Sequence, residues 1–300
     1  MIRSMTWLVE RIPEPLKYND AFAWVVRSAL RLRAARLEKL IFSATTGRSG
    51  TKALAALFAR IPDCISLHEP NPCMNGEVLR AAAYGDSGRV ERAYRQRKSL
   101  RIWQAAIRHR YYVEINHLFI KTFASQALEE FGDRVRIIHL VRPPIDVATS
   151  IFCLEEVPGT TAGNDWWLDH RAPTNQIRIA EVLDTDRRFT HPFYRALWYW
   201  YEIEQRISTW RRRLPAGQFV RFETGWLNEP ARVFALFDAL NLPYSPPPIL
   251  EQVGARIHAR EYHKRSAAIP ADLATDMHHR FQRLLLDRGV DVSALSALAA

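Results

Sequence analysis

The 300-residue sequence lacks long apolar runs, paired cysteines and internal repeats. No stretch is apolar enough to span a bilayer as a helix. No signal peptide is expected, because Glu10 and Pro13 interrupt the short apolar run near the start. The three cysteines form no CxxC pair and no metal-ligand spacing, so we expect neither a disulfide framework nor a metal site. These absences predict a cytoplasmic protein in a reducing compartment.

Acidic residues are outnumbered, with 32 Asp and Glu against 42 Lys and Arg and a formal net charge of +10. Such a balance favours an anionic partner: nucleotide phosphates, an acidic polysaccharide, nucleic acid or an anionic membrane surface. The aromatic share of 11%, which includes nine tryptophans, argues against a disordered chain. Composition alone does not choose among these partners.

Short runs rich in β-forming residues alternate with helical patterns along most of the chain. The predicted strands are 39–45, 64–68, 112–116, 135–141 and 218–223. The predicted helices include 53–61, most of 77–110, 119–131, a helix after Pro143 and Pro144, 192–213 and 230–240. This alternation predicts an α/β domain over 39–300, in which helices flank a parallel sheet. Ligands of such sheets bind where the strands end, so we expect 45–52, 68–70, 116–117 and the residues from 142 onward to line one edge.

Residues 1–38 form a separate predicted unit, a basic and amphipathic helical extension. Apolar side chains recur at helical spacing, and arginines occupy the other faces: Phe22, Val25, Val26, Ala29 and Leu30 against Arg27, Arg31 and Arg33. The extension is interpreted as a helix that packs on the main domain. The alternative is a helix that lies on anionic lipid and gives the protein a peripheral membrane contact.

The sequence TTGRSGTK, residues 45–52, follows the first predicted strand and precedes a helix. A tight turn at this place points several backbone N–H groups and a helix N-terminus at one spot, which suits a phosphate. The sheet is therefore predicted to be of the P-loop type. The ATPase pattern is incomplete, however, because Ala53 follows Lys52 where a Ser or Thr would bind magnesium.

A second anion-binding candidate is HLVRPPIDVATS, residues 139–150. Arg142 ends a predicted strand, and Ser150 lies eight residues later, about two helical turns on. Both side chains are expected to face one anion near the start of that helix. Taken alone the pattern is weak, because an arginine after a strand is common and a helical serine is usually just solvated.

Together the two motifs resemble the PAPS-dependent sulfotransferase family, in its bacterial or carbohydrate-type branch, where PAPS is 3′-phosphoadenosine-5′-phosphosulfate. The segment GRSGTKAL is similar to the family's 5′-phosphosulfate loop, and LVRPPIDVATS is similar to its 3′-phosphate segment. The late segment FVRFETGWLNEP, residues 219–230, also fits, so the resemblance covers about residues 39–245. It implies a sulfotransferase that moves a sulfuryl group from PAPS to an acceptor hydroxyl without a metal.

The resemblance also implies roles for individual residues. The 5′-phosphosulfate would be held by five consecutive residues: Arg48, Ser49, Gly50, Thr51 and Lys52. Arg142 and Ser150 would hold the 3′-phosphate. The basic segment 256–265 stands where the family often has a loop that closes on the nucleotide, with Lys264 and Arg265 as its candidates; the alternative is a solvated basic loop.

A base should take the acceptor proton, and three residues compete for that role. Glu69 is the first choice, because HEP resembles an acidic segment of carbohydrate sulfotransferases; its alternative is a turn carboxylate. His117 is the second choice, because cytosolic sulfotransferases place a catalytic histidine after the corresponding strand. His68 is the third, or contacts the substrate. Arg48 or Lys52 would neutralise charge on the bridging oxygen. Many members carry a Lys-Thr pair where this chain has Ile115 and Asn116, so that catalytic lysine is absent.

The loop 154–175 is long enough to need a functional reason. Trp166 and Trp167 are interpreted as surfaces that stack on an acceptor, with Gly159 and Gly163 as hinges of a lid. The alternative is a buried tryptophan pair that anchors the loop. The aromatic residues between Trp198 and Trp210 stand at helical spacing and are interpreted as core.

Two other classes of function compete with a sulfotransferase. A P-loop kinase or ATPase would share the sheet and the loop, but the strand 135–141 ends in Arg142 where that class needs an acid. A non-catalytic basic module would explain the charge but not two anion loops at strand ends. We therefore expect a hydroxylated acceptor, such as a carbohydrate, a glycolipid or a small metabolite, and no nucleic-acid partner.

Overall fold

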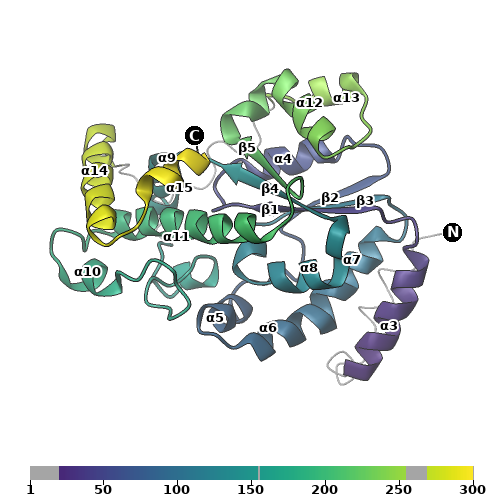
Figure 1. Ribbon diagram of the computed structural model, residues 1–300, viewed down its shortest axis with the longest axis horizontal. Helices are drawn as coiled ribbons and strands as arrows, with labels where there is room; N and C mark the ends of the chain where they lie inside the picture. Colours follow the sequence, from purple (N-terminus) through teal and green to yellow (C-terminus); the bar gives the residue numbers. More distant parts are fainter. Residues whose placement is uncertain (1–19, 155, 255–268, 300) are drawn as a thin grey trace.

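The computed structural model describes residues 20–154, 156–254 and 269–299, and Figure 1 shows a parallel sheet with helices on both faces. The strands are β1 (Lys39–Ala44), β2 (Cys64–His68), β3 (Tyr111–Ile115), β4 (Val135–Val141) and β5 (Phe219–Glu223). Their order in the sheet is β2-β3-β1-β4-β5, and every neighbouring pair is parallel. The predicted α/β class is confirmed, and each predicted strand lies within one residue of the observed one.

The central strand β1 is the point where the direction of the chain through the sheet reverses. From β1 the chain moves to β2 and β3 on one side, then to β4 and β5 on the other. The connections that leave β1 and β4 therefore separate at the carboxyl end of β1. The loop 45–50 follows β1 directly, so the topology puts the predicted phosphate loop at the place where α/β sheets bind ligands.

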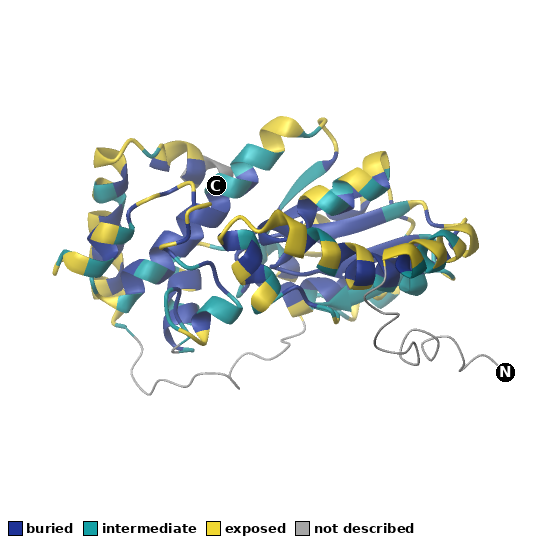
Figure 2. Ribbon diagram, turned by 90° about the horizontal axis from the view of Figure 1, so that it is seen from below, coloured by how far each residue is buried: buried dark blue, intermediate teal, exposed yellow. Residues whose placement is uncertain are grey.

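Alternate residues of the central strands face two separate cores. Leu40 and Phe42 of β1 belong to one buried cluster, and Ile41 belongs to the other. In β4, Ile137 and Ile138 divide in the same way. Both faces are therefore dry, which explains why the run 135–141 is apolar almost throughout. Figure 2 shows these strands buried between exposed outer surfaces of helices.

The helices cover the two faces unequally. One face carries α4 (Thr51–Phe58), α12 (Pro230–Ala239) and α13 (Pro246–Leu250). The other face carries α7 (Ser99–Ala106), α8 (Ala124–Phe131) and α11 (Pro192–Arg213), with α5 (Glu77–Ala83), α6 (Ser87–Ala93) and the π-helical turn η1 (Tyr94–Lys98) beyond them. The helices α9 (Pro144–Phe152), α10 (Ala180–Thr185), α14 (Ala271–Asp287) and α15 (Val292–Ala299) form the end of the molecule past the strand ends.

The stretch 77–110 is mostly helical, as predicted: it holds α5, α6, η1 and α7, and Gly85 turns the chain with a φ of 85° between the first two helices. One helical prediction needs correction. The predicted helix 119–131 begins instead as the 3₁₀ turn η2 (Phe119–Lys121), and the α-helix α8 starts only at Ala124. Lys121, the last residue of that 3₁₀ turn, contacts His117.

Helix α3 (Asp20–Arg33) is the described part of the predicted N-terminal extension, and residues 1–19 lie outside the described residues. It packs against α7 and η1, and Ala23 and Leu30 join the core beneath the sheet. Its packed face differs from the prediction, because Val25, which was expected to pack, is 56% exposed. The side chains of Trp24 and Leu32 are also exposed, at 62% and 80%. Among the described helices, none is long and apolar enough to cross a membrane. Membrane contact through this helix stays a prediction.

Candidate functional site

The loop between β1 and α4 has an unusual backbone. Gly47, Arg48 and Gly50 all adopt positive φ angles, of 79°, 56° and 78°. An added Cβ at Gly50 would lie 2.6 Å from Cδ1 of Leu227, so this position requires glycine. Arg48 bears the strain of the left-handed region without being glycine, and such strain is concentrated at functional sites. The first N–H groups of α4, which have no intrahelical acceptor, follow directly.

Side chains of the loop and of its neighbours hold this shape. The Ser49 hydroxyl donates to the carbonyl of Gly47 at 2.8 Å, and Ser49 is fully buried. From α11, the Tyr199 hydroxyl donates to the carbonyl of Thr46 at 2.9 Å. From the turn after β5, the Thr224 hydroxyl lies 2.9 Å from the carbonyl of Ser49. The Ser49 hydroxyl therefore stabilises the loop from within, and its contact with a ligand stays a prediction.

The two predicted anion motifs meet in space although about a hundred residues separate them. Arg48 Nε donates to Ser150 Oγ at 2.9 Å, and Arg142 Nη1 donates to the Arg48 carbonyl at 2.8 Å. The carbonyl of Arg142 accepts from Trp200 Nε1 of α11 at 2.9 Å. Burial lowers the pKa of Arg48, and the neighbouring Arg142 lowers it further. The junction thus joins two guanidinium groups, from the residues that precede α4 and α9, with the Ser150 hydroxyl from the second half of α9.

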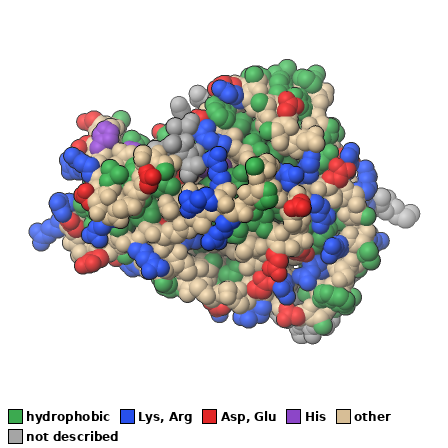
Figure 3. All heavy atoms as spheres, in the orientation of Figure 1, with side chains coloured by type: hydrophobic (Ala, Val, Ile, Leu, Met, Phe, Trp, Pro, Cys, Tyr) green, Lys and Arg blue, Asp and Glu red, His purple; other side chains and the backbone are tan. Residues whose placement is uncertain are grey.

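On the visible face of the space-filling view, Lys and Arg side chains gather near the centre, between the part that carries α14 and α15 and the part that carries α12 (Figure 3). This gathering lies over the region where the strands end. It agrees with an anionic ligand at this edge of the sheet.

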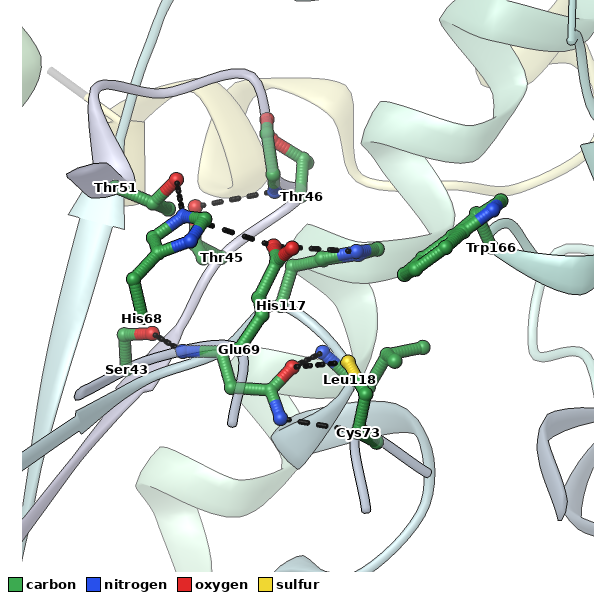
Figure 4. Close-up of polar contacts among 12 residues, drawn as sticks. Ser43, Thr45, Thr46, Thr51, His68, Glu69, Cys73, His117, Leu118 and Trp166 are labelled. Carbon is green, nitrogen blue, oxygen red and sulfur yellow. Dashed lines mark hydrogen bonds and ion pairs between the residues drawn. The ribbon is translucent and has the colours of Figure 1, made fainter. Parts of the chain in front are cut away.

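A second cluster, of one carboxylate and two imidazoles, lies at the ends of β2 and β3. Figure 4 shows the Glu69 carboxylate between the rings of His68 and His117. Its Oε1 is 3.9 Å from His68 Nε2 and 3.5 Å from His117 Nε2. His68 Nε2 is also 2.9 Å from the hydroxyl of Thr51, the first residue of α4. The cluster therefore adjoins the predicted phosphate loop.

Burial and charge distinguish the three candidate bases. The side chain of Glu69 is 24% exposed, whereas that of His117 is only 4% exposed. Burial raises the pKa of Glu69, although Lys121, Lys52 and Arg48 oppose the rise. Burial lowers the pKa of His68 to about 4 and lowers the pKa of His117 well below its ordinary value. Glu69 is therefore a strengthened base within reach of solvent, and both histidines are neutral at pH 7.

A buried ion pair supports the turn that carries Glu69. Lys98 contacts the carboxylate of Glu114 on β3, and both side chains are almost fully buried. Lys98 Nζ also donates to the carbonyls of Pro70 and Pro72, at 3.4 and 3.1 Å. Asn116, directly after β3, donates to Glu114 at 2.8 Å. These contacts fix the ends of β2 and β3 relative to one another.

The loop 154–175 divides between the two interpretations given to it. Trp167 is 5% exposed and packs against Tyr199 and His117, with ring centroids 5.4 and 5.1 Å apart, so it anchors the loop. Trp166 is half-buried and stacks near His117 at 6.2 Å. At Gly163, an added Cβ would lie 2.0 Å from the carbonyl oxygen of Val157. Close packing, rather than a hinge, therefore explains this glycine. The corresponding Cβ of Gly159 would lie 2.5 Å from the His170 ring.

Several residues of the candidate site carry no motif in the sequence. Lys121 is 4% exposed and contacts His117, and Tyr199, Trp200 and Thr224 hold the two anion loops from behind. For Lys121, the one sign in the sequence was its position four residues after His117. The aromatic run of α11 is confirmed as core, because Trp198 and Trp200 are buried. Lys52 is exposed, and Lys264 and Arg265 lie outside the described residues.

The described residues contain no group of three or more His, Cys, Asp or Glu side chains placed to hold a metal ion. No protein-family model and no curated protein matches the sequence. Among solved structures, the chain is similar to the sulfotransferase domain from the curacin biosynthetic pathway, with 16% identity, a TM-score of 0.49 and coverage of 85% of this chain and 99% of that one.

Two further solved structures are also sulfotransferases. One is from Alicyclobacillus acidocaldarius, with 16% identity, a TM-score of 0.44 and coverage of 85% of this chain and 98% of that one. The other is from Mycobacterium tuberculosis H37Rv, with 11% identity, a TM-score of 0.45 and coverage of 86% and 82%. Since these TM-scores are below 0.5, the chemistry of the site has to come from this chain's own residues.

Proposed function

We propose that the protein is a sulfotransferase that uses PAPS as its donor and the hydroxyl of a carbohydrate, a glycolipid or a small metabolite as its acceptor. One observation carries the proposal: the two anion motifs, with Arg48, Arg142 and Ser150, meet at one junction beside Glu69. A donor with phosphate groups at two positions needs two such motifs side by side. A single-phosphate site would not need the second.

The chemistry of the junction suits this donor. Arg48 is half-buried next to Arg142, and burial and like charge both disfavour its protonated form. A phosphate between the two guanidinium groups would relieve that repulsion through charge-assisted hydrogen bonds. The hydroxyl of Ser150 and the first N–H groups of α4 add donors to the same edge. We assign the 5′-phosphosulfate to the loop 47–52 and the 3′-phosphate to Arg142 and Ser150.

When bound, PAPS supplies a sulfuryl group whose sulfur forms a bond to the acceptor oxygen as its bond to the nucleotide phosphate breaks. Glu69 takes the proton of the acceptor hydroxyl, because its pKa is raised and it is accessible to solvent. Arg48 and Lys52 neutralise charge at the phosphate loop. His117 lies beneath Glu69 and orients it, and Trp166 borders the same cluster as a surface for the acceptor.

The alternative of a magnesium-dependent kinase has weaker support. Ala53 follows Lys52, and Arg142 follows β4, so neither position offers the oxygen ligand that magnesium prefers. The residues at these two places favour an anion that is held by cationic side chains alone.

The decisive experiment is calorimetric titration with 3′-phosphoadenosine-5′-phosphate, the desulfated product, against ADP and ATP, each with and without magnesium. We expect the 3′-phosphorylated nucleotide to bind tightly and equally in both conditions, and ADP to bind more weakly. Preference for ATP with magnesium would refute the proposal and support the kinase.

The Arg142→Ala variant tests the assignment of the 3′-phosphate. Loss of a charge-assisted contact of roughly 1.5–3 kcal/mol predicts at least tenfold weaker binding of the 3′-phosphorylated nucleotide, with little change for ADP. The matched control is Arg188→Ala, which removes an exposed arginine whose partner is Asp186, in the segment after α10. Equal affinities of Arg142→Ala and the wild type would show that the 3′-phosphate binds elsewhere.

A further inference from the structure

Lys121 is a lysine in the interior of the protein, 4% exposed at the end of the 3₁₀ turn η2. Three acceptors surround its Nζ: Nδ1 of His117 at 2.8 Å, the carbonyl of Trp166 at 2.7 Å and the hydroxyl oxygen of Tyr199 at 2.9 Å. A protonated lysine has three N–H donors and no acceptor. The number of acceptors therefore equals the number of protons on a lysine ammonium.

Two of these three hydrogen bonds have a fixed direction. The carbonyl of Trp166 only accepts. The Tyr199 hydroxyl donates its proton to the carbonyl of Thr46, so its oxygen accepts from Lys121. The third N–H of an ammonium then points at Nδ1 of His117, which must be unprotonated to accept it. A neutral amine would instead turn its lone pair to Nδ1, and the ring proton would have to sit there.

The opposite side of the imidazole decides between these two arrangements. His117 Nε2 faces Oε1 of Glu69 at 3.5 Å. If Nδ1 accepts from Lys121, the neutral ring carries its proton on Nε2 and presents it to the Glu69 carboxylate. If Nδ1 is protonated, a bare Nε2 lone pair opposes that carboxylate, which is repulsive unless Glu69 is also protonated. The single proton of the neutral His117 ring therefore couples the two charges: an ionised Glu69 favours a charged Lys121, and a charged Lys121 favours an ionised Glu69.

The surroundings of Lys121 shift its pKa in both directions. Burial lowers its pKa, as does Arg206, whereas Glu69 and Cys73 raise it. Its Nζ also lies 5.5 Å from the ring centroid of Trp167 and 5.2 Å from that of Tyr199, which favours a cation. The three acceptors and the two rings favour the ammonium, because only the charged form makes all of these contacts.

We propose that Lys121, as an ammonium, is a positioning residue that holds His117 in its Nε2–H tautomer, so that the imidazole supports the Glu69 carboxylate and is not itself the base. The tautomer follows from hydrogen bonds of this chain alone. The role of Glu69 as the acceptor of the substrate proton rests on the proposed function.

The test is nitrogen NMR of protein labelled with ¹⁵N-histidine, because the ring nitrogens of the two tautomers resonate in different ranges. The His117→Asn variant identifies the signals of this ring. In the wild type at pH 7 we expect one signal of a protonated nitrogen, assigned to Nε2, and one of an unprotonated nitrogen, assigned to Nδ1. A proton on Nδ1 in the wild type would overturn the proposal without any variant.

Three lysine variants separate positioning from a general structural effect. In Lys121→Met the donor is gone, and the two ring signals should move towards each other as the tautomers mix. Lys121→Gln restores an N–H donor without a charge and should recover the separation of the signals in part. Lys39→Met, the matched control, removes a lysine that donates to the carbonyls of Leu240 and Asn241 and should leave His117 unchanged. Unchanged signals in Lys121→Met would refute the proposal.

Titration with 3′-phosphoadenosine-5′-phosphate keeps this inference distinguishable from the proposed function. Lys121 is assigned no contact with the nucleotide, so Lys121→Met should bind it within about threefold of the wild type, a difference of less than about 0.7 kcal/mol. Failure of the wild type to bind would refute the sulfotransferase but would leave the tautomer intact. A Lys121→Met variant with altered ring signals and normal binding is the expected pair of results.

Discussion

The buried pair of Lys98 and Glu114 makes a sharp prediction about stability. The two side chains are 1% and 0% exposed, and Lys98 also donates to two proline carbonyls in the turn after Glu69. In Lys98→Met the aliphatic part of the side chain is retained, but the Glu114 carboxylate loses its counter-ion. Removal of one partner from a buried pair costs roughly 3–5 kcal/mol. Glu114 keeps donors from Tyr112 at 2.6 Å and Asn116 at 2.8 Å, so we expect the lower end of this range.

For a chain of this size, about 3 kcal/mol corresponds to a fall in Tm of about 6 °C, which differential scanning calorimetry measures readily. The double variant Lys98→Met/Glu114→Gln removes both charges and replaces the carboxylate by an amide of the same shape. It should therefore recover at least half of the loss. A single variant with the Tm of the wild type would refute the reasoning. A double variant less stable than the single one would show that the charge on Glu114 is not the cause.

Three further predictions concern the loop, the base and the helix α3. Glu69→Gln should raise Tm at pH 7, and the gain should vanish as the pH falls through the pKa of Glu69: the raised pKa makes the ionised carboxylate a burden that the protonated form lacks. A constant gain would contradict this sign. Gly50→Ala should lower Tm more than Gly217→Ala, whose φ of 89° is similar but whose added Cβ would have no atom within 4 Å; equal losses would mean that φ alone matters and the contact with Leu227 does not. Trp24→Ser should reduce co-sedimentation with anionic phospholipid vesicles if α3 contacts lipid, and a wild type that stays in solution would end that prediction.

The architecture was predictable because each strand carries its evidence locally. The run 135–141 is apolar on both of its faces, and it is observed as β4 with both faces buried. Helix boundaries were less predictable. The 3₁₀ turn at Phe119 depends on how the chain leaves β3, since Leu118 N donates to Asn116 Oδ1 at 2.9 Å there. A pattern of apolar spacing does not record such a side-chain contact.

For the site, the motifs predicted which residues lie close together but not how their side chains are oriented. TTGRSGTK marked the predicted phosphate loop, yet the buried Ser49 hydroxyl donates to a carbonyl within the loop, which only the folded structure reveals. The paired tryptophans were equivalent in sequence. Packing against Tyr199 buries Trp167, while Trp166 stays half-exposed and gives its carbonyl to Lys121. The difference arises from contacts with α11, some 30 residues further along the chain.

By itself the sequence determined the strands, their parallel arrangement and the two anion motifs, because these depend on patterns within short segments and on chain order. Only the tertiary structure decided which groups share a hydrogen bond. It brought Ser150 to Arg48, and it placed Glu69 against the ring of His117 and Lys121 behind that ring. Such pairings join segments that are far apart in the chain, and their charge states depend on burial, which is a property of the whole fold.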